Sequence, residues 1–142
     1  MNKKSSDTAY EIVRNLLEND PFSRWMGIRI EEADDGYCRI SCRVKANMLN
    51  GFKIAHGGII FSLADTALAF AAATSGQPAL ALDHSVTFTR KAESGEVLTA
   101  TANKVNLTRK TGLYLAEVRN GTEEIVAVLK GTVYRPSPKN DK

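Results

Sequence analysis

Near the start of the chain, apolar residues recur at the spacing of one helical face. They predict an amphipathic helix over 8–19, which opens with the capping-box pattern formed by Thr8 and Glu11. Asp20 and Pro21 end this helix, and they suit the N-cap and the first position of a second short helical turn. The N-terminal region is therefore predicted to be helical, with one apolar face turned toward the rest of the protein.

Most later segments alternate apolar and polar residues, which is typical of half-buried strands. The alternation is clearest over 37–45, where two cysteines, an isoleucine and a valine share one face. The segment 27–33 is predicted to pair with it through a turn at 34–36. Four further segments are predicted to be strands: 79–90, 97–106, 113–119 and 125–134.

The segment 57–73 is different because it has almost no polar face. A helix that is apolar all round is expected to be buried all round. At 17 residues, with Asp65 in its middle, it is too short and wrongly charged to span a membrane. The order of helix, two strands, buried helix and four strands predicts an α+β fold. A single antiparallel sheet would wrap the buried helix, which is the hotdog arrangement.

Length and composition fit one globular domain. A chain of 142 residues can bury one core, and 43% hydrophobic residues argue against a mainly disordered protein. Residues 1–142 are therefore predicted to form a single domain, with loose tails at 1–6 and 136–142. The N-terminal tail lacks the apolar run of a signal peptide, which predicts a cytoplasmic location.

Charge and cysteine content narrow the possible ligands. The net charge is +3, but the basic residues are interleaved with 16 acidic ones, so nucleic-acid binding is not expected. Cys38 and Cys42 are predicted to lie roughly 13 Å apart along one strand, too far for a disulfide. With only His56 and His84 besides, the sequence offers no thiolate metal site.

Two features of the apolar helix carry candidate chemistry. Asp65 is an ionisable group in apolar surroundings, where it needs either a partner or a function. Gly57 and Gly58 lie where the helix starts, so their N–H groups have no partner within the helix and can bind an anion or an oxyanion. Alternatively, the glycines only let a loop enter a helix, and Asp65 only bonds to nearby backbone or to Thr66.

The two histidines are predicted to be structural rather than catalytic. His56 suggests a general base, but a cation is disfavoured beside a helix N-terminus, so we expect it to bond to the backbone. His84 shares the apolar face of its strand with Leu80, Leu82, Val86 and Phe88. We expect it to be a core residue or part of a pocket wall.

The runs MLNG, HGG and FSLADTA between Met48 and Ala67 closely resemble the PaaI-type hotdog thioesterases of phenylacetate degradation. The resemblance extends to the VTFTR segment and to the KTG turn at 110–112, and it covers nearly the whole chain. It implies hydrolysis of an acyl-CoA, with an arylacetyl or hydroxyphenylacetyl group favoured. It implies no metal or redox cofactor.

The resemblance also implies roles for individual residues. The Gly57 N–H would polarise the thioester carbonyl, Asn50 would help to hold it, and Asp65 would activate water or attack directly. The substrate-binding residues would be His56, Gly58, Thr66 and Phe61. Basic side chains near strand ends are candidates for the CoA phosphates, although such side chains are often only solvated: Arg90, Lys91, Arg109 and Lys110.

Two departures from the family pattern leave one role open. Arg90 is followed by Lys91 where relatives commonly have proline, and Ala81 stands where some relatives place a hydroxyl group that orients the water. Thr66 or Ser85 are possible substitutes. The acyl group is open as well, because apolar residues near the motif also suit medium chains: Phe52, Ile54, Ile59 and Ile60.

Other functions of the same fold are a hydratase that uses His56 as its base and a noncatalytic acyl-CoA-binding module.

The helix geometry adds an expectation about assembly. Asp65 lies eight residues after Gly57, roughly 12 Å along a helix axis at 1.5 Å per residue, so one chain cannot bring both to one carbonyl. We expect a homodimer with shared active sites, assembled further into a dimer-of-dimers tetramer.

Overall fold

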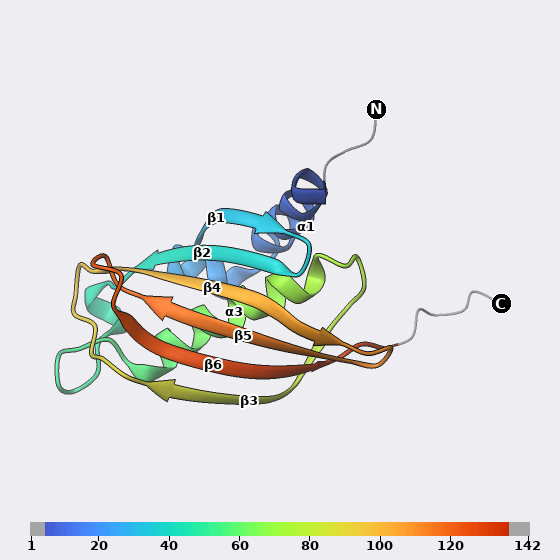
Figure 1. Ribbon diagram of the computed structural model, residues 1–142. Coiled ribbons are helices and arrows are strands. Elements are labelled where there is room, and N and C mark those ends of the chain that lie inside the picture. The colour runs from blue at the N-terminus through green and yellow to red at the C-terminus, as the bar shows by residue number, and fades with distance from the viewer. Residues whose placement is uncertain (1–4, 137–142) are drawn as a thin grey trace.

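A computed structural model describes residues 5–136 of the chain. Its elements follow the predicted order (Figure 1): α1 (Ser5–Glu18), α2 (Pro21–Met26), β1 (Arg29–Asp34), β2 (Tyr37–Arg43), the 3-10 turn η1 (Ala46–Met48), α3 (Gly57–Ala73), β3 (Leu80–Phe88), β4 (Val97–Leu107), β5 (Thr111–Arg119) and β6 (Ile125–Tyr134). The strand bounds agree with the prediction to within a few residues. Most of the two predicted loose tails lies outside the described residues.

The six strands form one antiparallel sheet in the order β1-β2-β4-β5-β6-β3. The sheet curves around α3, which lies across its inner face, as Figure 1 shows. The predicted α+β hotdog layout is therefore confirmed. None of the helices within residues 5–136 is long and apolar enough to cross a membrane.

The N-terminal helices follow the sequence signals closely. The side chain of Asp20 caps α2 by accepting a hydrogen bond of 3.0 Å from the Ser23 N–H, with Pro21 at the first helical position. The start of α1 differs from the prediction, because the helix begins at Ser5 rather than Thr8. Asp7 in the first turn complements the helix dipole and favours the earlier start.

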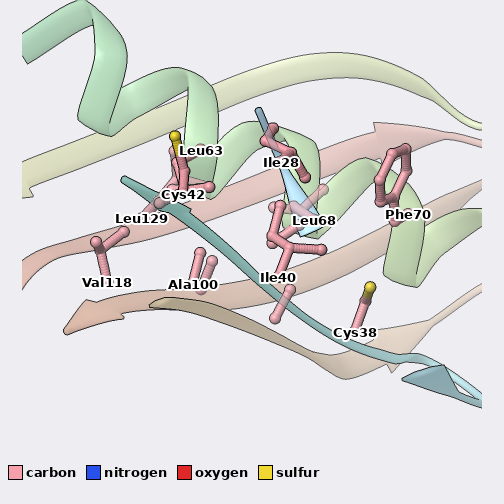
Figure 2. Close-up of a cluster of buried hydrophobic side chains, with 14 of the residues drawn as sticks. Ile28, Cys38, Ile40, Cys42, Leu63, Leu68, Phe70, Ala100, Val118 and Leu129 are labelled. Carbon is pink, nitrogen blue, oxygen red and sulfur yellow. The ribbon is translucent and has the colours of Figure 1, made fainter. Parts of the chain in front are cut away.

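The core forms between α3 and the inner face of the sheet. The alternation in β2 buries Cys38, Ile40 and Cys42, and Figure 2 shows them on the side of the strand that faces α3. Burial raises the pKa of the Cys38 thiol to about 12, so this cysteine behaves as a small apolar residue. The inner faces of the strands carry several fully buried alanines, whose small size lets the sheet approach the helix closely: Ala100, Ala102, Ala116 and Ala127.

The prediction that α3 is buried all round is wrong for the single chain. One stripe of the helix stays uncovered, because the sheet curves around the other sides: Gly58 and Ala69 are exposed and the side chain of Asp65 is 40% exposed. The neighbouring edge strand β3 also exposes apolar side chains, with Leu80 and Leu82 each 59% exposed. The uncovered stripe and the edge strand together leave an incompletely buried surface.

The packing of α3 on the sheet should dominate the stability of the domain. Leu68 is 1% exposed, and we expect Leu68→Ala to lower the free energy of unfolding by about 2–5 kcal/mol, because it leaves a cavity. Urea unfolding followed by circular dichroism measures this difference. Val105→Ala is the matched control, since Val105 is 52% exposed. Equal losses in the two variants would contradict the account of the core.

Candidate active site

The start of α3 opens onto a groove of about 380 Å³. It lies where β3 ends, because the last residue of that strand, Phe88, forms part of its wall. The groove brings together the first residue of α3, the loop that precedes the helix, and the basic pair that follows β3. Its lining consists of Asn50, Ile54, Ala55, Gly57, Ile60, Phe88, Thr89, Arg90 and Lys91.

Asn50 is held in one orientation by its own loop. Its side-chain oxygen Oδ1 accepts hydrogen bonds from the backbone N–H groups of Phe52, at 2.9 Å, and of Ile54, at 3.4 Å. Two backbone donors can only face the oxygen of an amide, so they fix which end of the side chain is Nδ2. The amide nitrogen is therefore the end of Asn50 that is left to donate a hydrogen bond in the groove.

His56 caps α3. Its Nδ1 accepts a hydrogen bond of 2.8 Å from the Gly58 N–H, and its carbonyl oxygen accepts from Ile59 and Ile60. Of the first four N–H groups of the helix, only that of Gly57 has no acceptor among the described residues. The Gly57 N–H is therefore the free donor at the positive end of the helix dipole. The Gly58 N–H, by contrast, is already used.

Gly57 also leaves little room for a side chain. A Cβ atom at this position would lie 3.3 Å from the ring of Phe88, closer than most real contacts. The glycine therefore lets the helix start lie against the end of β3, and Phe88 becomes a wall of the groove. The contact between Gly57 and Phe88 was not apparent from the sequence, because the two residues are 31 positions apart.

Asp65 lies elsewhere on α3 and does not line this groove. Its Oδ1 is 2.8 Å from Nε2 of His84, and the two side chains are 40% and 8% exposed, respectively. His84 was predicted to be a core or pocket-wall residue, and its contact with Asp65 was not predicted. A signal was available, because His84 lies on the inward face of β3 and Asp65 is the one charged residue within 57–73.

The ring of His84 fits beside a glycine of the next strand. His84 is the cross-strand neighbour of Gly131 on β6, and a Cβ atom at Gly131 would lie 2.7 Å from Nδ1 of the ring. The ring of Phe61 lies on another side, with the ring centroids 6.2 Å apart. Gly131 thus provides the space in which the imidazole reaches Asp65, a role that the sequence did not reveal.

Basic side chains stand at two opposite ends of the sheet. Arg90 and Lys91 line the groove, and Arg90 is held by an ion pair of 2.9 Å with Glu124. Hydrogen bonds from Asn120 and Thr122 lower the pKa of Glu124, which keeps this partner charged.

Arg109 and Lys110 occupy the turn between β4 and β5. This turn lies beside Tyr134 of β6, whereas Phe88 pairs with Ala127. The two ends lie seven residue steps apart along β6, roughly 23 Å at 3.3 Å per residue. A single chain therefore does not bring all four basic residues to one groove.

The possible substitutes for the missing hydroxyl group lie apart from the carboxylate. Thr66 follows Asp65 on α3 but is buried. Ser85 follows His84 on β3, and alternation along the strand directs it to the opposite face of the sheet. No group of three or more His, Cys, Asp or Glu residues within residues 5–136 is arranged to hold a metal ion.

Comparison with known proteins identifies the family to which a chain with this fold and this groove belongs. Residues 52–127 match the family model for the thioesterase superfamily, and the chain belongs to this family. It is an α+β hotdog thioesterase, as its resemblance to the PaaI-type enzymes predicted.

Individual relatives agree with this membership. The chain is 37% identical over 130 residues to the acyl-coenzyme A thioesterase PaaI of Escherichia coli, covering 92% of this chain and 93% of that protein. It is 42% identical over 132 residues to a provisionally named esterase of Archaeoglobus fulgidus, covering 93% and 86% of the two chains. The solved structure of E. coli PaaI, from the phenylacetic acid degradation operon, superposes with a TM-score of 0.92 at 36% identity and covers 94% and 97%.

The capping role of His56 gives a prediction that separates it from a catalytic base. His56→Ala should lower the free energy of unfolding by about 0.5–2 kcal/mol, because the Gly58 N–H loses its acceptor. His56→Asn should restore most of that stability, since asparagine is a good N-cap. Thermal unfolding of both variants measures the difference. If the two variants were equally destabilised, N-capping of α3 would not explain how His56 stabilises the protein.

Proposed function

We propose that this thioesterase hydrolyses acyl-CoA thioesters, with an arylacetyl-CoA or hydroxyphenylacetyl-CoA as its substrate, in active sites shared by two copies of the chain. The observation that carries the proposal is the convergence of two free donors in one groove. The Gly57 N–H and the Asn50 amide nitrogen both belong to the groove at the start of α3, and Arg90 and Lys91 stand beside them.

Hydrolysis of a thioester develops negative charge on the carbonyl oxygen. Donors that are already fixed stabilise this charge without reorganising, which is the largest contribution in many acyl-transfer enzymes. Gly57 is fixed by the helix, and Asn50 is fixed by its two backbone donors. In this proposal the thioester oxygen lies between these donors, and the acyl chain lies against Ile54, Ile60 and Phe88.

The carboxylate comes from the partner chain. Asp65 is roughly 12 Å further along α3 than Gly57, and it is absent from the groove lining. A second copy that added its β3 beside this β3 would cover the exposed edge and the uncovered stripe of α3. Two α3 helices would then run antiparallel, which brings the Asp65 of one chain toward the groove of the other. The carboxylate would activate a water molecule or attack the thioester carbon directly.

A two-fold arrangement also accounts for the second basic pair. The strand β3 would run antiparallel to its copy, so the end of one chain that carries Arg109 and Lys110 would lie near the groove end of the other. Both basic pairs could then face the CoA phosphates of one site. We further propose that two such dimers associate as a tetramer.

A panel of acyl-CoAs tests the proposed activity and its substrate class. Release of free CoA, measured with a thiol reagent, should be fastest with arylacetyl-CoAs, because the groove is walled by an aromatic ring and branched side chains. Faster release from medium-chain acyl-CoAs would overturn the arylacetyl assignment. Conversion of an enoyl-CoA without thiol release would indicate a hydratase, and binding without turnover would indicate a noncatalytic module.

The role of Asp65 is tested by removing its charge. Asp65→Asn is expected to lower kcat by at least about 10²-fold, because positioned acid–base groups contribute about 10²–10⁴. Asp83→Asn is the matched control, since it removes the carboxylate of the residue that precedes His84 on β3, on the opposite face of the strand, while keeping the backbone carbonyl. Turnover near that of the wild type in the Asp65 variant would contradict the catalytic assignment.

Mixing two inactive variants tests whether the site is shared. An Asn50→Ala chain and an Asp65→Asn chain, exchanged after reversible dissociation, should form mixed dimers with one doubly altered site and one intact site. Random pairing makes about half of the dimers mixed, so activity should return to about a quarter of the wild type. Each variant exchanged with itself is the control. Demonstrated exchange that restores no activity would place Asn50 and Asp65 in the same site of one chain.

A further inference from the structure

The imidazole of His84 has an oxygen acceptor at both of its nitrogens. Nδ1 lies 2.9 Å from the backbone carbonyl oxygen of Asp83, and Nε2 lies 2.8 Å from Oδ1 of Asp65. A carbonyl oxygen only accepts hydrogen bonds, so the proton in the first contact belongs to Nδ1. A neutral imidazole has only one N–H group. The second contact therefore needs one more proton, because a bare Nε2 and a carboxylate oxygen would otherwise face each other with lone pairs.

The extra proton has two possible positions within the pair. It can lie on Nε2, which gives an imidazolium beside a carboxylate, or on Asp65, which gives a neutral imidazole beside a carboxylic acid. An imidazole is a much stronger base than a carboxylate in water. The side chain of Asp65 is 40% exposed, so its charged form stays partly hydrated. Both observations favour the imidazolium.

We propose that His84 is a positioning residue that holds a proton against Asp65, so that its imidazolium fixes one carboxylate oxygen and leaves the other for the reaction. The inference rests on the proposed function only in its consequence for catalysis. With Oδ1 held by Nε2–H, the remaining oxygen Oδ2 is the one that can reach a water molecule or a thioester carbon. The carboxylate then needs no reorientation when substrate arrives.

Within residues 5–136, the elements packed around His84 place no charge other than that of Asp65 on its face of the sheet. The charged side chains on the three elements packed around His84 are Asp65 on α3, Asp83 on β3 and Lys130 on β6. Alternation along the strands turns Asp83 and Lys130 to the face opposite the imidazole, since His84 is opposite Gly131. The protonation of the pair is therefore governed by His84 and Asp65 themselves.

Nitrogen NMR of the free protein reads this state without any turnover. The chain has two histidines, and they are expected to differ. His56 accepts a hydrogen bond at Nδ1, so it should be a neutral imidazole protonated at Nε2 alone. His84 should carry protons on both nitrogens at neutral pH, because each nitrogen faces an oxygen acceptor. A His56→Asn variant assigns the signals, and His84 with a single N–H at that pH would overturn the proposal.

Two substitutions test the consequence for catalysis. His84→Gln keeps an N–H donor that no alkaline pH removes, whereas His84→Leu keeps bulk but no donor. We expect the leucine variant to lose about ten- to a hundred-fold in kcat with little change in KM, because the carboxylate is no longer held. The glutamine variant should recover part of this loss, and its pH profile should lack any limb that arises from the protonation of residue 84.

The two experiments separate this inference from the proposed function. If the wild-type protein released no thiol from any acyl-CoA, the proposed function would fail. The NMR experiment would still report the protonation state of His84 beside Asp65. If the wild type were active but the leucine variant kept kcat within about two-fold and the same pH profile, the positioning role of His84 would be wrong. Asp83→Asn serves again as the control, because it changes a neighbouring charge without touching either contact of the imidazole.

Discussion

The structure depends on covering an apolar helix of 17 residues with a single sheet. Six antiparallel strands curve around α3, and alanines on the inner faces of the strands let the two layers approach closely. This open sheet leaves one side of the helix uncovered. The stripe that stays uncovered carries Asp65, and the edge strand beside it exposes leucines. The incomplete coverage and the candidate chemistry therefore occur on the same side of the molecule.

The length of α3 separates the two chemical functions that it carries. Its first residue offers the free N–H of Gly57 beside the oriented amide of Asn50, and its middle offers the carboxylate of Asp65. A straight helix holds these groups apart by more than two turns. In the proposed mechanism, the same rigidity that fixes the donors keeps one chain from completing the site alone, and a second copy of the chain supplies the carboxylate.

The two histidines show how hydrogen-bond partners decide the role of an imidazole. His56 receives a backbone N–H at Nδ1 and so needs a lone pair there, while His84 meets oxygen acceptors at both nitrogens and so needs protons there. Their sequence neighbours do not distinguish them. The distinction comes from the start of α3 in one case, and from the approach of β3 to Asp65 in the other.

The sequence by itself determined the order of elements, the faces of the strands, the apolar helix at 57–73 and the family, because periodicity and local motifs encode these features directly. It also singled out Asp65 and Gly57, since a carboxylate or glycine in such a place is chemically conspicuous, while Asn50 was added by the family resemblance. The contact of Phe88 with Gly57, the space beside Gly131 and the Asp65–His84 pair were decided only by the tertiary structure. Each joins residues that lie far apart in the chain, and their meeting depends on strand register and sheet curvature, which no local pattern specifies.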